Sequence, residues 1–190
     1  MTTRDKLVTA LTQMNRLMKE DNKNGHQWVY TNHLHRAKTF QAARKNGNYK
    51  TNCCDGVHWG CKLAGIDPEA LCWYGSRGRI AWCGENAEKE ARKVFNIIPV
   101  LGKKTVRELY REGHLQPGDI LTYMAFSHTN CYLGDKKSFD SGHAYCDRQG
   151  ELAPFKRWKG ALAHKNDRVG YILRIKENYD KNNHSVLEWW

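Results

Sequence analysis

The spacing of apolar residues changes once along this chain, from a helical period in its earlier part to short strand-like runs in its later part. Leu7, Leu11, Met14 and Met18 recur every three or four residues, which predicts an amphipathic helix over about residues 3–21. The later runs are rich in β-branched and aromatic residues and are separated by Gly, Asp or Pro. Helices followed by antiparallel strands predict an α+β fold.

Start and stop signals set the other predicted elements. Four more helices are expected over residues 33–47, 54–64, 85–96 and 105–113, the last with Thr105 and Glu108 in capping-box positions. Strands are expected over residues 119–126, 128–134, 137–142 and 168–176. A length of 190 residues suits one domain with a single hydrophobic core.

The chain is strongly basic, with a formal net charge of +11. Such a surplus attracts polyanions, and nucleic acid, anionic lipid and the teichoic acid of a bacterial wall all qualify. Because the basic residues are scattered and form no block of five or six, a solvated basic surface is an equally good interpretation. Charge alone does not choose among these partners.

Cysteine usage argues against a disulfide framework and against a metal. The count of seven is odd, and no C-x₂-C pair of the kind that binds structural zinc is present. His143 and Cys146 form a close His/Cys pair. We therefore expect no metal and no other cofactor.

Two adjacent cysteines, Cys53 and Cys54, lie at the predicted start of the third helix. A helix N-terminus stabilises a thiolate, the reactive form of cysteine, so Cys54 is a candidate nucleophile, while Cys53 is expected to lie outside the helix. The alternative is that Cys54 is a small buried apolar residue. A nucleophile needs a base, and His128, at the start of a predicted strand, is the candidate.

Residues 50–142 resemble the NlpC-like branch of the papain-like cysteine peptidases, which is related to the CHAP amidases. Three stretches carry the resemblance: NCCDGVHWGCKLAGI around Cys54, LQPGDILTYM, and HTNCYLGDKKSFD from His128 onward. The resemblance implies a papain-like fold in which N-terminal helices pack on an antiparallel sheet. It divides a single catalytic domain into an N-terminal helical part (1–48), a papain-like core (49–176) and a C-terminal tail (177–190).

Within this resemblance Cys54 matches the nucleophile, His128 the base and Asp140 the third, orienting residue. Other matches are Gly56, the turn Pro117-Gly118-Asp119, and the strand end Tyr132-Leu133-Gly134. The departures are Cys53 for the usual Asp, Asp55 for Ser and Asn130 for Gly. Tyr49, Asn52 and Asp55 are predicted to line the oxyanion or substrate site, beside the backbone N–H of Cys54.

The third residue depends on the hairpin at GDKK, because pairing register decides which residues share a face of a sheet. A loop of two or four residues puts His143 on the face of His128, whereas a loop of three or five residues puts Asp140 there. The resemblance favours Asp140, and a carboxylate suits the task of holding the imidazole. His143 is the alternative.

The resemblance implies hydrolysis of an amide bond in peptidoglycan, either within the stem peptide or at N-acetylmuramoyl-L-alanine. The expected partner is the anionic cell wall, with no obligatory nucleic acid and no membrane span. Since the N-terminus does not resemble a signal peptide, we expect synthesis in a bacterial or phage-infected cytoplasm, as for a phage-type endolysin. The alternatives are a cysteine peptidase or deamidase acting on proteins, and an inactive module that binds wall or nucleic acid.

Overall fold

The computed structural model describes residues 1–31, 39–45, 47, 49–66, 85–123, 129–140, 151–154 and 168–179. The elements are α1 (Thr3–Lys23), β1 (Val29–Tyr30), α2 (Phe40–Lys45), β2 (Lys50–Thr51), α3 (Cys53–Leu63), α4 (Glu85–Val94), β3 (Phe95–Pro99), α5 (Val106–Arg111), β4 (Ile120–Tyr123), β5 (Thr129–Gly134), β6 (Lys137–Asp140), β7 (Glu151–Pro154) and β8 (Val169–Ile175). No helix in these ranges is long and apolar enough to cross a membrane.

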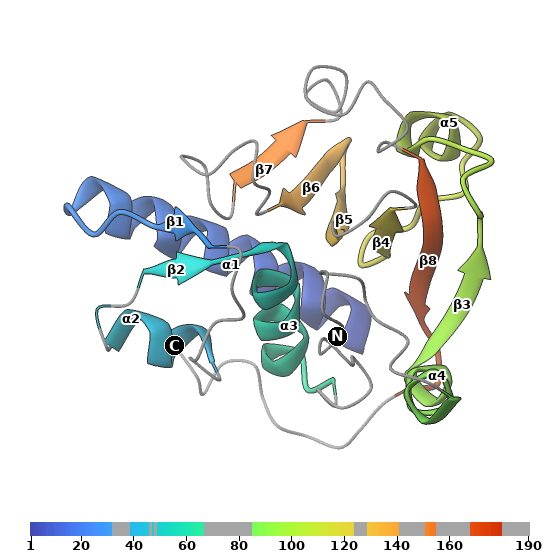
Figure 1. The fold of residues 1–190 in the computed structure, drawn as a ribbon, viewed down its shortest axis with the longest axis horizontal. Helices are drawn as coiled ribbons and strands as arrows, with labels where there is room; N and C mark the ends of the chain where they lie inside the picture. Colours follow the sequence, from blue (N-terminus) through green and yellow to red (C-terminus); the bar gives the residue numbers. More distant parts are fainter. Residues whose placement is uncertain are drawn as a thin grey trace.

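Six of the strands form one antiparallel sheet in the order β3-β8-β4-β5-β6-β7, so the late strand β8 lies between two earlier ones (Figure 1). The face covered by α1 and α3 holds the larger hydrophobic core. On the opposite face, α5 packs Val106 and Leu109 against Leu121 and Ile172 of the sheet. The chain is thus an α+β protein with helices on both faces of the sheet.

The helix α1 is set by local and packing signals together. Thr2 caps it by accepting a hydrogen bond from the Asp5 N–H, and the Asp5 carboxylate accepts one from the Thr2 N–H in return. Its apolar stripe is fully buried, at Leu7, Leu11 and Met14 among others. The stripe lies against α3, where Gly60 allows a close approach.

Gly60 of α3 packs closely against Leu11 of α1. A Cβ atom added at Gly60 would lie 2.7 Å from the Leu11 Cγ atom, closer than carbon atoms pack. Any larger side chain at this position therefore pushes α3 away from α1 or forces Leu11 out of its rotamer. The crossing also positions the two cysteines, because α3 begins with them.

The turn before β4 is closed by a buried ion pair. The Arg174 guanidinium, on β8, donates to both carboxylate oxygens of Asp119 at 2.9 and 2.7 Å. Asp119 has no exposed surface and also accepts from the Gln116 N–H. Gly118, at φ +88°, adopts a backbone conformation that favours glycine, and its Cα faces Arg4 of α1.

The predicted helices at 3–21, 54–64 and 105–113 are confirmed as α1, α3 and α5, and the four predicted strands as β4, β5, β6 and β8. The helix predicted over 33–47 is shorter where it is described, as α2. The prediction of helix over 85–96 is wrong at its end. There Phe95 begins β3, because pairing with β8 and burial of Phe95 outweigh the local helical pattern. The strands β1, β2 and β7 were not predicted.

We expect Gly60→Ala to lower the free energy of unfolding by about 1–3 kcal/mol, because overpacking outweighs the better helix propensity of alanine. Urea denaturation measures the change. In a Leu11→Ala background, where the clash is removed, the same substitution should be neutral or stabilising. A Gly60→Ala protein more stable than the wild type would contradict the close crossing.

Candidate active site

The first turn of α3 carries the cysteine pair. Asn52, in an extended conformation, caps the helix by accepting a hydrogen bond from the Asp55 N–H at 2.8 Å. Cys53 is therefore the first helical residue and Cys54 the second. The expectation that Cys53 lies outside the helix is wrong, because the cap is Asn52 and not Cys53.

Both thiols are buried, each with 3% of its residue surface exposed, and their sulfur atoms lie 3.9 Å apart. The contact with the Cys53 thiol, then burial, and then the negative charges of Cys53 and Asp55 raise the pKa of Cys54 well above its ordinary value. The position at the helix N-terminus does not outweigh these effects. Cys54 is therefore a protonated thiol at neutral pH in these surroundings, contrary to the expectation of a stabilised thiolate.

Tyr30 is the neighbour that sequence reasoning missed. Strand β1 runs parallel to β2, with Thr31 N–H donating to the Thr51 carbonyl at 2.9 Å, and this pairing puts Tyr30 beside the chain that enters α3. Burial raises the pKa of Tyr30 to about 12, and the charges of Cys53, Cys54, Asp140 and Asp55 add to this. The phenol thus remains a proton donor at neutral pH.

The same result brings Cys54 and Asp140 within electrostatic reach of one hydroxyl group. A two-residue strand inside a polar stretch gives no periodic signal, so nothing in the sequence pointed to Tyr30. The Tyr30 hydroxyl is the group whose ionisation both predicted site residues affect.

Asp140 ends β6, and the pairing register of the β5–β6 hairpin decides which face of the sheet it occupies. Asp135 and Lys136 form a two-residue turn, both with positive φ, and a bulge between Tyr132 and Gly134 shifts the pairing by one residue. Tyr132 consequently pairs with Ser138, which puts Asp140 on the same face as Asn130 and Tyr132. The choice between Asp140 and His143 as the partner of His128 stays a prediction, because both histidines lie outside the described residues.

The opposite face of these strands packs against the helices. Cys131 and Phe139 belong to the core that α1 and α3 cover, so strand alternation turns Asp140 away from that side of the sheet. Asp140 is nonetheless near enough to Tyr30 to affect its ionisation. Cys54 belongs to the core on the helix-covered face, whereas Asp140 is turned to the other face at the end of β6. His128 and His143 lie outside the described residues.

The remaining predicted site residues have other contacts. The Tyr49 ring stacks on His26 at 4.9 Å and meets Trp28 edge-on, which gives it a packing role. The Asn52 side-chain oxygen serves as the helix cap. His58 lies one turn after Cys54 and was overlooked; burial and Lys62 lower its pKa to about 4, so its imidazole is neutral at pH 7.

Within the described ranges, no three His, Cys, Asp or Glu side chains converge in a way that could hold a metal ion. Comparisons with protein-family models, curated proteins and solved structures gave no match to this chain. The resemblance to NlpC-like peptidases accordingly rests on its motif residues alone.

We expect native Cys54 to react with iodoacetamide at pH 7 at least about tenfold more slowly than a free cysteine, because each unit of raised pKa lowers the thiolate fraction tenfold. The rate should keep climbing with pH beyond the range in which a free cysteine levels off, and peptide mapping by mass spectrometry follows it. The same protein unfolded in urea provides the control. Fast labelling of Cys54 below pH 7 would contradict the buried, protonated thiol.

Proposed function

We propose that this chain is a papain-like cysteine hydrolase in which Cys54 attacks an amide bond of bacterial peptidoglycan. The observation that carries the proposal is the position of Cys54 in the first turn of α3, where Cys54 and Asp140 are both among the groups whose charges affect the ionisation of Tyr30. Peptidoglycan is proposed as the substrate because the motif residues resemble wall-cleaving enzymes, and the net charge of +11 suits an anionic wall.

The turn before β4 supports the resemblance on physical grounds. Pro117-Gly118-Asp119 leads directly into β4, and β4 pairs with β5, the strand that follows His128 in the chain. The positive φ of Gly118 and the burial of Asp119 explain why this motif needs those two residue types. Packing and backbone conformation are therefore enough to account for the motif. The pairing of β4 with β5 is compatible with the proposal.

The raised pKa of Cys54 determines when the thiol loses its proton in the proposed mechanism. A preformed thiolate is disfavoured, so the proton leaves the sulfur as Cys54 attacks the carbonyl carbon, and His128 accepts it as general base. His128 then protonates the leaving amine, and a water molecule activated by His128 releases the acyl group. Asp140 holds the imidazole in the orientation that this exchange requires.

The negative oxygen of the tetrahedral intermediate needs donors near the start of α3. The backbone N–H of Cys54 is one, since the first turn of a helix directs its N–H groups outward along the axis. The Tyr30 hydroxyl is the second, because its pKa of about 12 keeps the proton in place at neutral pH. The Asn52 amide contributes by capping the helix and so fixing the Cys54 backbone.

A second candidate function is an inactive module that binds wall or nucleic acid. The burial of Cys54, at 3% exposed, and its raised pKa favour it, because both also fit a structural cysteine. The two candidates differ in what happens to purified peptidoglycan, and a peptidase acting on proteins differs from both in its substrate.

We expect Cys54→Ala to lower the rate of peptidoglycan hydrolysis by at least about a thousandfold, because it removes the nucleophile. Cys53→Ala is the matched control, since it makes the same change at an equally buried neighbour. It should not lower the rate by more than about threefold, because losing the Cys53 contact lowers the pKa of Cys54 and leaves the nucleophile in place. Loss of turbidity measures hydrolysis, and mass spectrometry of the released fragments identifies the bond. Thermal unfolding checks that both variants fold.

Equal activity of the two variants would refute Cys54 as the nucleophile. A wild-type protein that binds peptidoglycan without releasing fragments would support the binding module. Cleavage of a protein panel with none of peptidoglycan would support the peptidase.

A further inference from the structure

A basic patch lies on the side of the sheet opposite to α3, where the β5–β6 hairpin meets α5. It consists of Arg107, Arg111 and Lys136, and we call it the α5 patch. Arg107 and Arg111 are one helical turn apart and so point the same way, and Lys136 stands at the tip of the hairpin. Its Nζ atom lies 5.7 Å from the centre of the Tyr110 ring.

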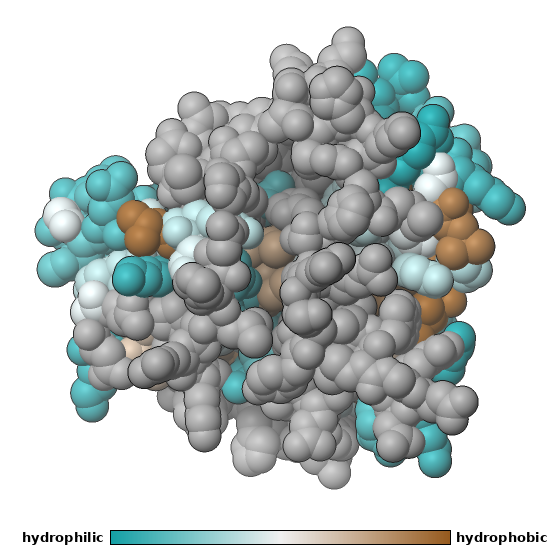
Figure 2. All heavy atoms as spheres, viewed as in Figure 1, coloured by the Kyte–Doolittle hydropathy of each residue, from teal (hydrophilic) through white to brown (hydrophobic). Residues whose placement is uncertain are grey.

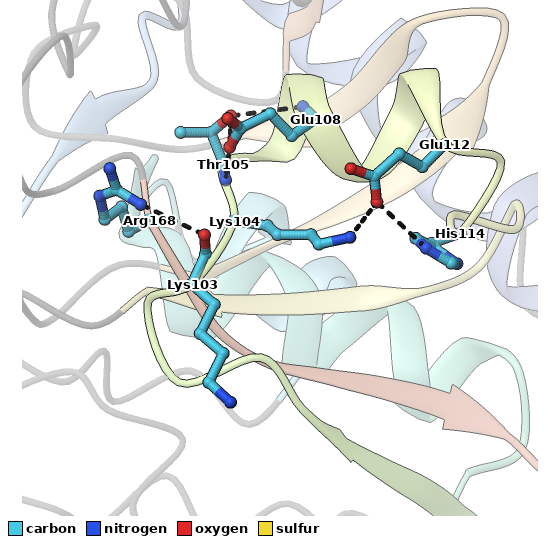
Figure 3. Close-up of polar contacts among 7 residues, drawn as sticks. All are labelled: Lys103, Lys104, Thr105, Glu108, Glu112, His114 and Arg168. Atoms are coloured by element: carbon cyan, nitrogen blue, oxygen red, sulfur yellow. Dashed lines mark hydrogen bonds and ion pairs between the residues drawn. The ribbon is translucent and has the colours of Figure 1, made fainter.

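The acidic residues of α5 do not neutralise this patch, because local contacts occupy them. Glu108 accepts hydrogen bonds from the Thr105 N–H and hydroxyl, which completes the helix cap (Figure 3). Glu112 pairs with Lys104 and, at 3.1 Å, with His114. Neither Arg107 nor Arg111 forms an ion pair with a carboxylate among the described residues.

Two features that other polyanions use are missing from the patch. Tyr110 is packed edge-on against the buried Tyr132 at 6.5 Å and is covered by Lys136, so no open ring is available for stacking a nucleic-acid base. The exposed large apolar residues in the described ranges are Met1, Val29 and Leu101, and none belongs to the patch, as insertion into a lipid surface would require. Side chains at the position of α5 are hydrophilic in the space-filling view (Figure 2).

We infer that the α5 patch binds a linear polymer of polyol units joined by phosphodiesters, the chemistry of poly(glycerol phosphate) in bacterial walls. Such a polymer offers regularly spaced negative charges and no bases, which matches a row of cations without a stacking surface. The choice of a wall polymer rests on the proposed function. Binding itself does not, because the patch and the cysteines lie on opposite faces of the sheet.

The test is binding of purified poly(glycerol phosphate) to the full chain, measured by isothermal titration calorimetry at about 0.15 M NaCl, near physiological ionic strength. The variant Arg107→Gln/Arg111→Gln/Lys136→Gln should bind at least about tenfold more weakly, as three charge-assisted contacts are lost. The matched control is Lys19→Gln/Lys23→Gln/Lys89→Gln, which removes the same charge from exposed positions on α1 and α4. It should bind within about threefold of the wild type.

An equal loss of affinity in the two triple variants would contradict the assignment of binding to the α5 patch, since net charge alone would then explain binding. The choice of ligand would be overturned if single-stranded DNA or phosphatidylglycerol vesicles bound more tightly than the polymer and if the patch variant weakened their binding equally. Cys54→Ala should bind the polymer like the wild type. Failure of binding therefore leaves the hydrolase assignment standing, and failure of hydrolysis leaves the patch standing.

Discussion

The packing of α1 on α3 at Leu11 and Gly60 is the contact on which the rest of the structure depends. It joins the first helix of the chain to the helix that carries the cysteine pair and lets both cover one face of the sheet. Burial of this apolar layer is the main stabilising term, since each fully buried Leu or Met side chain contributes about 1.5–3 kcal/mol. The same packing fixes the start of α3 and buries the thiols of Cys53 and Cys54.

The ion pair between Arg174 and Asp119 is a second constraint, and it involves the last strand of the sheet in the chain. Arg174 on β8 pairs with Asp119 in the turn before β4, so two segments far apart in sequence are held in one register. A buried ion pair adds little net stability, because desolvation offsets the attraction, but leaving either partner alone is costly. We infer that the ion pair helps to specify the register in which β8 pairs with β4.

The elements that the sequence predicted are those with a clear period or end signal. The apolar stripe of α1, the glycine after α3 and the Thr105 capping box were sufficient for three helices. The two-residue strands β1 and β2 carry no period, and β3 follows a helix without a break, so tertiary pairing alone defines them.

The candidate site was predictable only as residue types. The sequence pointed to Cys54 as a cysteine at a helix start and the resemblance pointed to Asp140, but the bulge that sets the register of Asp140, the burial that raises the pKa of Cys54, and the presence of Tyr30 all arise from contacts between distant segments. The most direct test of the account is mass spectrometry of the intact protein after rapid mixing with a peptidoglycan fragment and acid quenching. We predict a transient acyl group that maps to Cys54. An acyl group on Cys53, or hydrolysis with no acylated protein at any time, would contradict it.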